Sequence, residues 1–531
     1  MAAIGVAQSV AFMMLFHNAV TGWSPTGDIF YVASSVEHAM AGHPFTDFET
    51  KGLPAYYPSL YFWMVALIGW VLHLGVFRAV RTGVALALLV VPFLVYGLVG
   101  KVAGRAFAVA CGGLCVLFVA YGDLFAKPHE WLAGVCAVAW AIQATRSADR
   151  ADEDGWWPVA LWGVVLGLAT LSYELWTLLV ALVPLFLQFM DRSRPVSSRW
   201  RGARAVIASW IVGAIVCSPW WLPYGLAILK HGSQDLQPLW FITPYANLGG
   251  YATPFDWQSL AGKAAILALL GGMFLIRRRY VQAIYGCFLG AFMFQGVLFL
   301  DLALGGHGFV GVKWNMLGNI AAAFMLAALA AEGYGWLKQK WPDRANAGAV
   351  AGLCMAGLLM LPGLTSDTVV LQHQYTTAFN PPSYPAALVK ALNATPDPSG
   401  LNLLMGYAGG VLQQSPVYAW MPYNAFYADP AELVLDRLSA LQQEVKTAAG
   451  ASAFADWMRH NKFAPINGVV ATRVKGGYEV QTILVPSFPN GGNWINVIAP
   501  TKDLAAPAFR VTWQGDGVTV FLVANQSART T

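Results

Sequence analysis

The chain has 531 residues, of which 57% are hydrophobic and only 11% are charged. An ordinary soluble domain carries about 25% charged residues, so these charges are too few to cover the surface of a soluble chain of this length. The net charge is only +5, and no basic run is interleaved with aromatic residues, which disfavours a nucleic-acid-binding protein. The composition indicates a polytopic membrane protein.

Apolar runs set the order of the predicted membrane helices. A membrane-spanning helix needs about 20 predominantly apolar residues. Candidate runs begin near Ala3, Leu60, Gly83, Ala106, Glu130, Trp157, Leu175, Ala203, Leu260, Tyr280, Met316 and Ala347. The first run has no basic residue before it and no small-residue cleavage pattern, which favours a retained span over a signal peptide.

Basic loops orient these runs in the membrane. Five such loops contain Lys101 and Arg105, Arg146 and Arg150, Arg192 to Arg204, Arg277 to Arg279, and Lys338 to Arg344. All five lie on the cytoplasmic side if residues 60–77 form a juxtamembrane or re-entrant helix. If this run spans the membrane and the N-terminus stays inside, all five lie outside. The positive-inside rule therefore predicts a juxtamembrane helix over 60–77, about eleven transmembrane helices and a cytoplasmic N-terminus. This assignment places Arg78 and Arg81 outside, against the positive-inside rule, but the alternative would place five basic loops outside.

The same topology gathers the polar and aromatic residues outside the cytoplasm. The extracytoplasmic segments are the first loop over 23–59, residues 123–130, the turn at Tyr173–Glu174, and residues 230–258, 305–315 and all those after about 365.

The composition becomes that of a soluble domain from Ser366 onward. We therefore predict a transmembrane domain over 1–365 and an extracytoplasmic α+β domain over 366–531. Amphipathic patterns and turn residues predict helices and strands in the second domain. The predicted helices cover 431–447 and 453–461, and the predicted strands cover 468–474, 478–485, 494–499, 509–513 and 518–523.

The first loop carries the most informative acidic residue, Asp28, directly after the first span. An acidic side chain at the lipid–water boundary is costly unless it is paired or functional. It could accept a proton from an acceptor hydroxyl while a lipid-linked donor lies beside it in the bilayer. The alternative is that Asp28 caps a helix starting at Ile29, and the residue considered by itself favours the cap.

Several motifs together resemble a known superfamily. A first span is followed by Gly27–Asp28, an aromatic helix and the stretch "YYPSLYFW", and a second acidic segment, "GDLFAKPHEW", comes about a hundred residues later. This order resembles the opening of the GT-C glycosyltransferases, membrane enzymes that use polyprenyl-phosphate sugars. The C-terminal stretches "MPYNAFYADPAELVLDRLSAL", "FADWMRHNKFAPINGVV" and "FPNGGNWINVIAP" are similar to the galactan 5-O-arabinofuranosyltransferase family.

The resemblance implies a function and a location. It implies transfer of D-arabinofuranose from a polyprenyl phosphate to an extracytoplasmic, galactan-like glycan, by an enzyme of the bacterial inner (plasma) membrane. Many members of the superfamily have two adjacent acidic residues in the first loop, whereas Asp28 stands between glycine and isoleucine. This departure favours a single carboxylate acting as base, so we expect no metal ion and no other cofactor.

The remaining candidate site residues fall into two groups. The departing lipid phosphate needs cations or oriented donors; the candidates are Lys127, His129, His307 and Lys313. The candidates for acceptor contact or for support of the site are His43, Asp47, Glu49, Tyr56, Tyr57, Asp123, Glu130, Glu174 and Trp240. Four of these residues have a specific structural alternative. Lys313 could snorkel to the interface, Glu130 and Glu174 could form salt bridges between helices, and Trp240 could belong to an interfacial aromatic belt.

Other functions remain open from the residues alone. A flippase or transporter of lipid-linked saccharides is the main alternative, although the chain shows no internal repeat and no paired interrupted helices. A polysaccharide ligase would share the lipid-phosphate chemistry. A non-catalytic scaffold has only the C-terminal domain in its favour.

Overall fold

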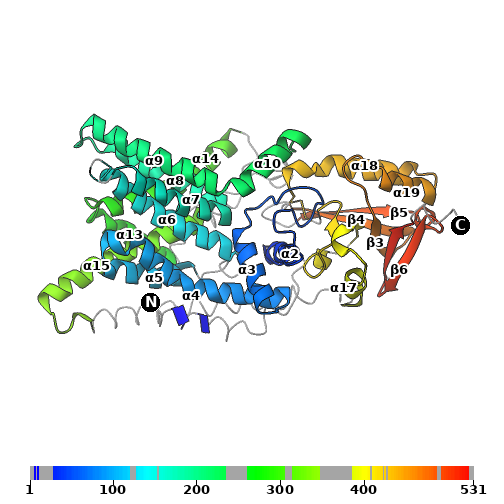
Figure 1. Cartoon of the computed structure of the whole chain (residues 1–531), viewed down its shortest axis with the longest axis horizontal. Helices are drawn as coiled ribbons and strands as arrows, with labels where there is room; N and C mark the ends of the chain where they lie inside the picture. The colour runs from blue at the N-terminus through cyan, green and yellow to red at the C-terminus, as the bar shows by residue number, and fades with distance from the viewer. Residues whose placement is uncertain are drawn as a thin grey trace. The chain divides into compact units, whose positions relative to one another are not determined.

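The structure of the chain is a computed structural model (Figure 1). It describes residues 5–6, 9–10, 28–119, 127–151, 153, 155–234, 260–304, 314–346, 386–406, 409–422, 424–425, 428–486 and 492–524. The chain divides into two compact units. The helical unit contains Met1–Val20, Arg81–Pro219 and Ala246–Gln374, and the loop-and-sheet unit contains Thr21–Val80, Trp220–Tyr245 and Tyr375–Thr531.

The helical unit is built around a buried helix. Its helices are α4 (Val76–Ala103, which begins in the other unit), α5 (Arg105–Val119), α6 (Pro128–Asp149), α7 (Trp157–Ser172), α8 (Glu174–Met190), α9 (Val196–Val216), α13 (Leu260–Met273), α14 (Arg279–Ala303) and α15 (Trp314–Lys340). Helix α6 is buried along most of its length. The indole Nε1 of Trp140 donates a hydrogen bond to Ser209 Oγ on α9 at 3.1 Å, which satisfies a polar atom inside the apolar core.

Helices α7 and α9 approach each other closely because glycines line their contact. A Cβ atom at Gly163 would lie 2.2 Å from the backbone oxygen of Ser209, and one at Gly167 would lie 2.7 Å from that of Gly213. No side chain fits at these separations. Small residues spaced four apart are the usual means by which membrane helices pack backbone to backbone.

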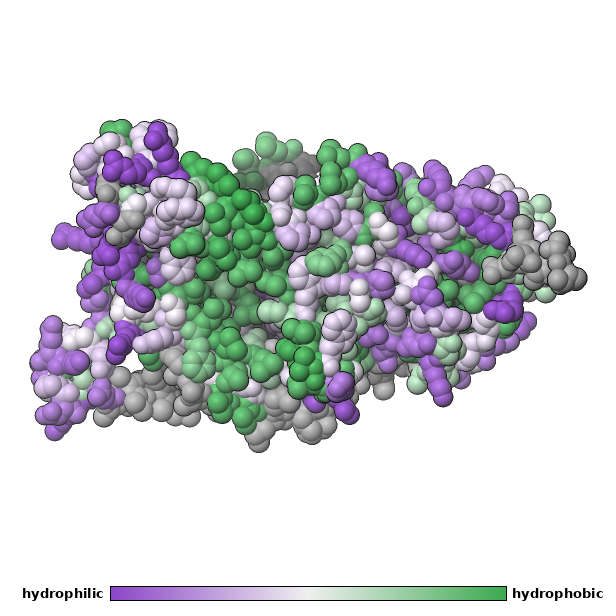
Figure 2. Space-filling model, in the orientation of Figure 1, coloured by the Kyte–Doolittle hydropathy of each residue, from purple (hydrophilic) through white to green (hydrophobic). Residues whose placement is uncertain are grey.

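The outer faces of α7, α8 and α9 are apolar. Exposed residues recur at helical spacing, for example Leu161, Leu168, Leu182 and Ile211, and Figure 2 shows hydrophobic residues gathered over these helices. Such exposed apolar faces suit lipid contact. In the described part of the chain, α4 and α15 are long and apolar enough to cross a membrane, and a bent pair of helices makes a possible third. The number of about eleven spans therefore stays a prediction.

The predicted helix over 60–77 is wrong in its C-terminal boundary. Helix α3 covers Leu60–Val71 and α4 starts at Val76, before the predicted start near Gly83. The left-handed backbone of His73 (φ 52°) ends α3, because a helix cannot continue through that conformation. The 12 residues of α3 extend about 18 Å, less than the roughly 30 Å of a hydrocarbon core. Its juxtamembrane placement stays a prediction.

The span predicted from Ala203 is also wrong in its form. Helix α9 already starts at Val196, and a separate helix, α10 (Ser218–His231), follows at an angle of 74°. Pro219 explains the break, because proline disfavours helical backbone at the residue before it and supplies no N–H.

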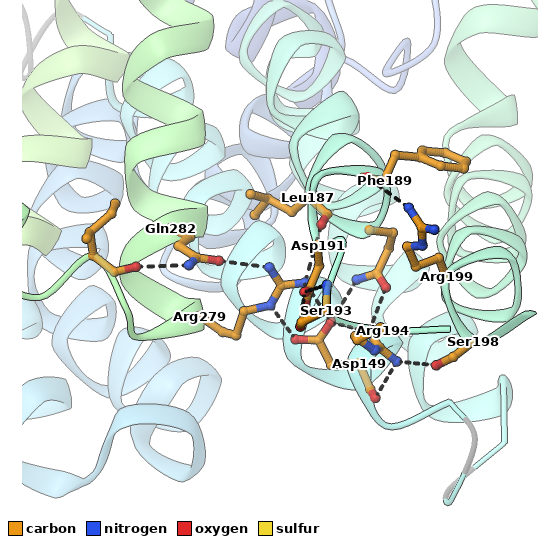
Figure 3. Close-up of polar contacts among 12 residues, drawn as sticks. Asp149, Leu187, Phe189, Asp191, Ser193, Arg194, Ser198, Arg199, Arg279 and Gln282 are labelled. Atoms are coloured by element: carbon orange, nitrogen blue, oxygen red, sulfur yellow. Dashed lines mark hydrogen bonds and ion pairs between the residues drawn. The ribbon is translucent and has the colours of Figure 1, made fainter. Parts of the chain in front are cut away.

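A polar network joins four helices at one end of the helical unit (Figure 3). The carboxylate of Asp149, on α6, accepts hydrogen bonds from Arg194 at 2.8 Å and from Arg279, at the start of α14, at 2.8 and 2.9 Å. Gln188, near the end of α8, donates to the same carboxylate at 3.0 Å. Arg194 also donates to Ser198, in the first turn of α9, at 2.7 Å.

This end of the unit carries all five basic loops. Arg146 donates to the backbone oxygen of Lys101, the Asp149 network joins the loops before α9 and α14, and Arg278 pairs with Glu332 of α15 at 2.7 Å. The five loops therefore lie at one end of the helical unit, as their predicted placement on one side of the membrane requires. Their assignment to the cytoplasm stays a prediction.

The loop-and-sheet unit contains a seven-stranded sheet within its described residues. The strands are β1 (Asn402–Met405), β2 (Tyr418–Ala419), β3 (Gly468–Val474), β4 (Gly477–Pro486), β5 (Gly492–Ala499), β6 (Phe509–Gly515) and β7 (Val518–Val523). Strand β1 is parallel to β2 and β3, and every other pairing is antiparallel: β3 with β4 and β7, β4 with β5, and β6 with β7. Helices α17 (Ala386–Asn393), α18 (Val434–Thr447) and α19 (Ala451–Arg459) complete this part.

The predicted elements after residue 430 are confirmed, with small changes of boundary. Strands β3 and β7 match the prediction at both ends, and the helix predicted from 431 starts at Val434. Strands β1 and β2 and helix α17 were not predicted. Only two residues form β2. Strand β1 pairs in parallel with β2 and β3, and parallel strands are not joined by a tight turn, so they leave no hairpin signal.

Candidate functional site

The first loop folds as part of the loop-and-sheet unit. Helix α2 (Asp28–Met40) is followed by a turn-rich loop and then by α3. The ring of Tyr31 on α2 lies 4.8 Å from that of Phe48, 4.5 Å from that of Tyr57 and 5.9 Å from that of Phe62. The aromatic residues of the sequence motif therefore form a core that fixes the loop against its two helices.

A small pocket opens beside this aromatic core. Its lining includes His43, Asp47, Tyr57 and Trp63, with Ser35 from α2. The cavity volume of about 10 Å³ holds roughly one water molecule. Three residues predicted to contact the acceptor, His43, Asp47 and Tyr57, thus line one pocket. A sugar ring is larger than this cavity, so the pocket must widen to bind one.

Asp47 also has a structural role in the loop. Its Oδ1 atom accepts hydrogen bonds from the backbone N–H groups of Glu49 and Thr50, both at 2.8 Å. These bonds close an Asx-type turn, which explains why an aspartate suits this position. Burial raises the pKa of Asp47 to about 6, and the two backbone donors oppose that shift.

The two tyrosines of the motif are held in different ways. The backbone oxygen of Tyr56 accepts a hydrogen bond from Trp220 Nε1 at 3.1 Å, and its ring lies 5.8 Å from that of Tyr224 on α10. Tyr57 packs on Tyr31 and lines the pocket. Aromatic faces of this kind can stack on sugars, and here they also join the loop to α2 and α10.

A group of buried charges lies beneath the loop. Asp429 and Glu432 precede α18, and Arg437 lies on its buried face. Burial raises the pKa of Asp429 to about 7 and that of Glu432 to about 8, while the positive charge of Arg437 opposes both shifts. The Asp47 carboxylate interacts electrostatically with all three residues.

The raised pKa values predict a pH-dependent loop. A carboxyl group whose folded pKa exceeds its ordinary value near 4 destabilises the folded state as it ionises, and this cost grows between the two values. We therefore expect the protection of the loop amides at 44–55 against hydrogen exchange, corrected for intrinsic rates, to fall from pH 5 to pH 8. One pKa unit corresponds to about 1.4 kcal/mol, so the fall should be at least about tenfold.

The amides of β6 and β7 provide the internal control for this experiment. The variant Asp47→Asn should flatten part of the pH dependence, because its side chain does not ionise. A loop whose protection is equal at pH 5 and pH 8 would contradict the prediction.

A second group of candidates lies in the helical unit, at the N-terminal ends of α6 and α8. His129 is 3% exposed and Glu130 is 2% exposed. The ring of His129 lies 5.8 Å from that of Tyr173, the extended residue (φ −166°, ψ 118°) that separates α7 from α8. Glu174 then begins α8, and the predicted turn at Tyr173–Glu174 is confirmed.

This second group has the properties of an anion site. Lys127 precedes α6 and is partly buried, and the N-terminal turn of a helix presents backbone N–H groups and a positive dipole end. A histidine and a lysine at that end can stabilise a phosphate. Glu130 is buried and Glu174 is partly buried beside them. Burial of an ionisable group is costly unless it is paired or serves a function.

Several predicted site residues lie outside the described structure. Asp28 is the first residue of α2, but its side chain is outside the described residues, and so are Asp123, Trp240, His307 and Lys313. Their roles stay predictions. Within the described part of the chain, no group of three or more His, Cys, Asp or Glu side chains could hold a metal ion, and the expectation of a metal-independent reaction also stays a prediction.

The sequence did not reveal Tyr418 and Arg437 as residues that support the first loop. A signal for Arg437 was present: the buried residues of α18 are Val434, Arg437, Leu438 and Leu441, a three–four spacing that places the arginine on the apolar face. No comparable signal marks Tyr418, because its short strand has no periodicity.

No protein-family model and no curated protein matches this chain. Among solved structures it is similar to ArnT from Cupriavidus metallidurans bound to undecaprenyl phosphate, with 14% identity, 98% of this chain and 97% of that chain covered, and a TM-score of 0.48. It is also similar to the Archaeoglobus fulgidus oligosaccharyltransferase tethered with an acceptor peptide, with 12% identity, 94% and 77% coverage, and a TM-score of 0.43.

Proposed function

We propose that this chain is a membrane glycosyltransferase of the GT-C class that transfers a sugar from a polyprenyl phosphate to an extracytoplasmic acceptor. The observation that carries the proposal is the pair of buried ionisable residues, His129 and Glu130, at the start of α6, a helix that the sequence predicts to span the membrane. They lie at the end of the helix opposite Asp149 and the basic loops. Ionisable groups buried in a membrane helix mark a functional site by default.

The proposed reaction is a displacement at the anomeric carbon. The acceptor oxygen forms a bond to this carbon while the bond to the lipid phosphate oxygen breaks. Asp28 takes the proton of the acceptor hydroxyl, and the lipid phosphate leaves as an anion. Lys127, His129 and the backbone N–H groups at the start of α6 stabilise the negative charge of the leaving phosphate.

The sugar and the acceptor follow from the sequence resemblance. The C-terminal stretches that contain Asp429, Glu432 and Arg437 are similar to the galactan 5-O-arabinofuranosyltransferase family. We therefore propose polyprenyl-phosphoryl-D-arabinofuranose as donor and a galactan-like glycan as acceptor, in the inner membrane of a bacterium.

Transfer by the purified full-length chain in lipid nanodiscs tests this proposal. Synthetic polyprenyl-phosphoryl arabinose, mannose and glucose are each offered with a galactan-like acceptor and a panel of other glycans. We expect product with the arabinose donor, and a loss of at least about tenfold for Glu130→Gln. Glu332→Gln, at the opposite end of the helical unit, is the matched control and should retain activity.

The same donors in sealed vesicles test the flippase alternative. Movement of the labelled lipid-linked sugar across the bilayer, without product from any donor and acceptor, would overturn the transferase and favour the flippase. Product with mannose or glucose alone would keep the class and overturn the arabinose assignment.

A further inference from the structure

Tyr418 of the C-terminal sheet contacts both parts of the first loop. It lies on β2 and is 3% exposed. Its hydroxyl group is 3.3 Å from Thr46 Oγ1, within hydrogen-bond distance. Its ring centroid lies 4.9 Å from that of His38 on α2 and 6.5 Å from that of His43. One side chain thus contacts the helix that begins at Asp28 and the loop that lines the pocket.

The backbone beside Tyr418 makes a second connection. The N–H of Ala419 donates to the backbone oxygen of Glu49 at 2.8 Å, and Lys51 Nζ donates to the backbone oxygen of Gly400, just before β1. Strand β2 ends the β2–β1–β3–β4–β5 strand order. The first loop therefore uses an unpaired strand edge of the C-terminal sheet as its support, since such an edge offers unpaired N–H and C=O groups.

The charges under the loop reinforce this connection. The guanidinium group of Arg437 lies 5.4 Å from the ring centroids of Trp420 and Phe463, and it donates to the backbone oxygen of Trp420, two residues after Tyr418. Its positive charge interacts with Asp47 in the loop. A buried arginine held by two aromatic faces and a carbonyl is a rigid base for the strand that carries Tyr418.

We propose that Tyr418 is a positioning residue for sugar transfer: through it, the C-terminal domain holds α2 and the first loop in the arrangement that the reaction requires. The role of Tyr418 in transfer rests on the proposed function, whereas its role in holding the loop does not. Asp28 begins α2 and His43 lines the pocket, so both depend on the contacts of Tyr418. A displacement of a reacting group by about 1 Å can cost about 100-fold in rate.

Three full-length variants in nanodiscs test the inference. Tyr418→Ala removes the ring and the hydroxyl group, and Tyr418→Phe removes the hydroxyl group alone. Tyr478→Ala is the matched control, because Tyr478 packs on Phe521 at 5.0 Å in the same sheet. Hydrogen exchange is measured over 44–57 and over β3 and β7. For each variant and the wild type, kcat and KM are measured with the arabinose donor and the galactan-like acceptor.

We expect Tyr418→Ala to raise exchange in the loop at least tenfold while β3 and β7 keep their protection. We expect its kcat to fall at least tenfold with KM for the donor changed less than threefold, and Tyr418→Phe to recover most of the loss. Tyr478→Ala should leave loop exchange unchanged.

Two results would overturn the inference: loop exchange that is unchanged in Tyr418→Ala, or an unchanged kcat in an enzyme whose wild type is active. A wild type that transfers no sugar, together with increased loop exchange in Tyr418→Ala, would overturn the proposed function and keep the docking of the loop on β2.

Discussion

Replacing Asp28 with asparagine is expected to lower sugar transfer by about 10²- to 10⁴-fold, the range that a positioned general base contributes, without unfolding the protein. The neutral amide cannot accept the proton of the acceptor hydroxyl. Asparagine serves as well as aspartate at the N-terminal end of a helix. The substitution therefore separates the two interpretations of this residue, as a base or as a cap of α2.

The control for this experiment is Asp28→Ser, which keeps a capping oxygen but is not a base at neutral pH. Both variants should lose activity while their thermal unfolding stays within a few degrees of the wild type. Full activity in both variants would remove Asp28 from the reaction and move the base to Asp123 or Glu130. Loss of folded protein in Asp28→Asn would instead assign the residue a structural role.

Asp149→Ala is expected to destabilise the helical unit by about 3 kcal/mol, the low end of the range for breaking a buried charge pair, because its partners are partly exposed. The change leaves Arg194 and Arg279 without the carboxylate that both of them bind in the wild type (Figure 3). Two positive charges then remain close together at the ends of four helices, and Asp191, 3.6 Å from Arg279, compensates only part of them. Unfolding of the full-length chain in nanodiscs, followed by tryptophan fluorescence, measures the loss.

Glu332→Ala is the matched control for Asp149→Ala. Its partner Arg278 is 52% exposed and Glu332 is 37% exposed, and exposed ion pairs contribute about 1 kcal/mol or less. Asp149→Asn should fall between the two variants, because an amide oxygen still accepts hydrogen bonds. Equal stability of Asp149→Ala and Glu332→Ala would contradict a central role for the network.

The Asp149 network also shows how far loop charges can be used as a guide. The positive-inside rule grouped the five basic loops correctly at one end of the unit. It treated every arginine alike, however, and could not tell that Arg194 and Arg279 share the Asp149 carboxylate, with Asp191 3.6 Å from Arg279. Sequence separation explains this failure, since Asp149 and Arg279 are 130 residues apart. Only the packing of α6 against α14 brings them together.

The sequence by itself determined the features that depend on local pattern. Low charge and long apolar runs indicated a membrane protein, alternation and turn residues located β3 to β7, and the aromatic motif after Asp28 marked the first loop. These features are read within one window of the chain, where the period of the apolar residues reflects which face is buried.

Only the tertiary structure decided what supports the candidate site. It placed Tyr418 against His38 and Thr46, Arg437 beneath Asp47, and His129 against Tyr173. The physical reason is that a contact between distant segments leaves no periodic signal in either one, because each residue is selected by a neighbour far along the chain. The strand edge that holds the first loop, only two residues long, is the clearest example.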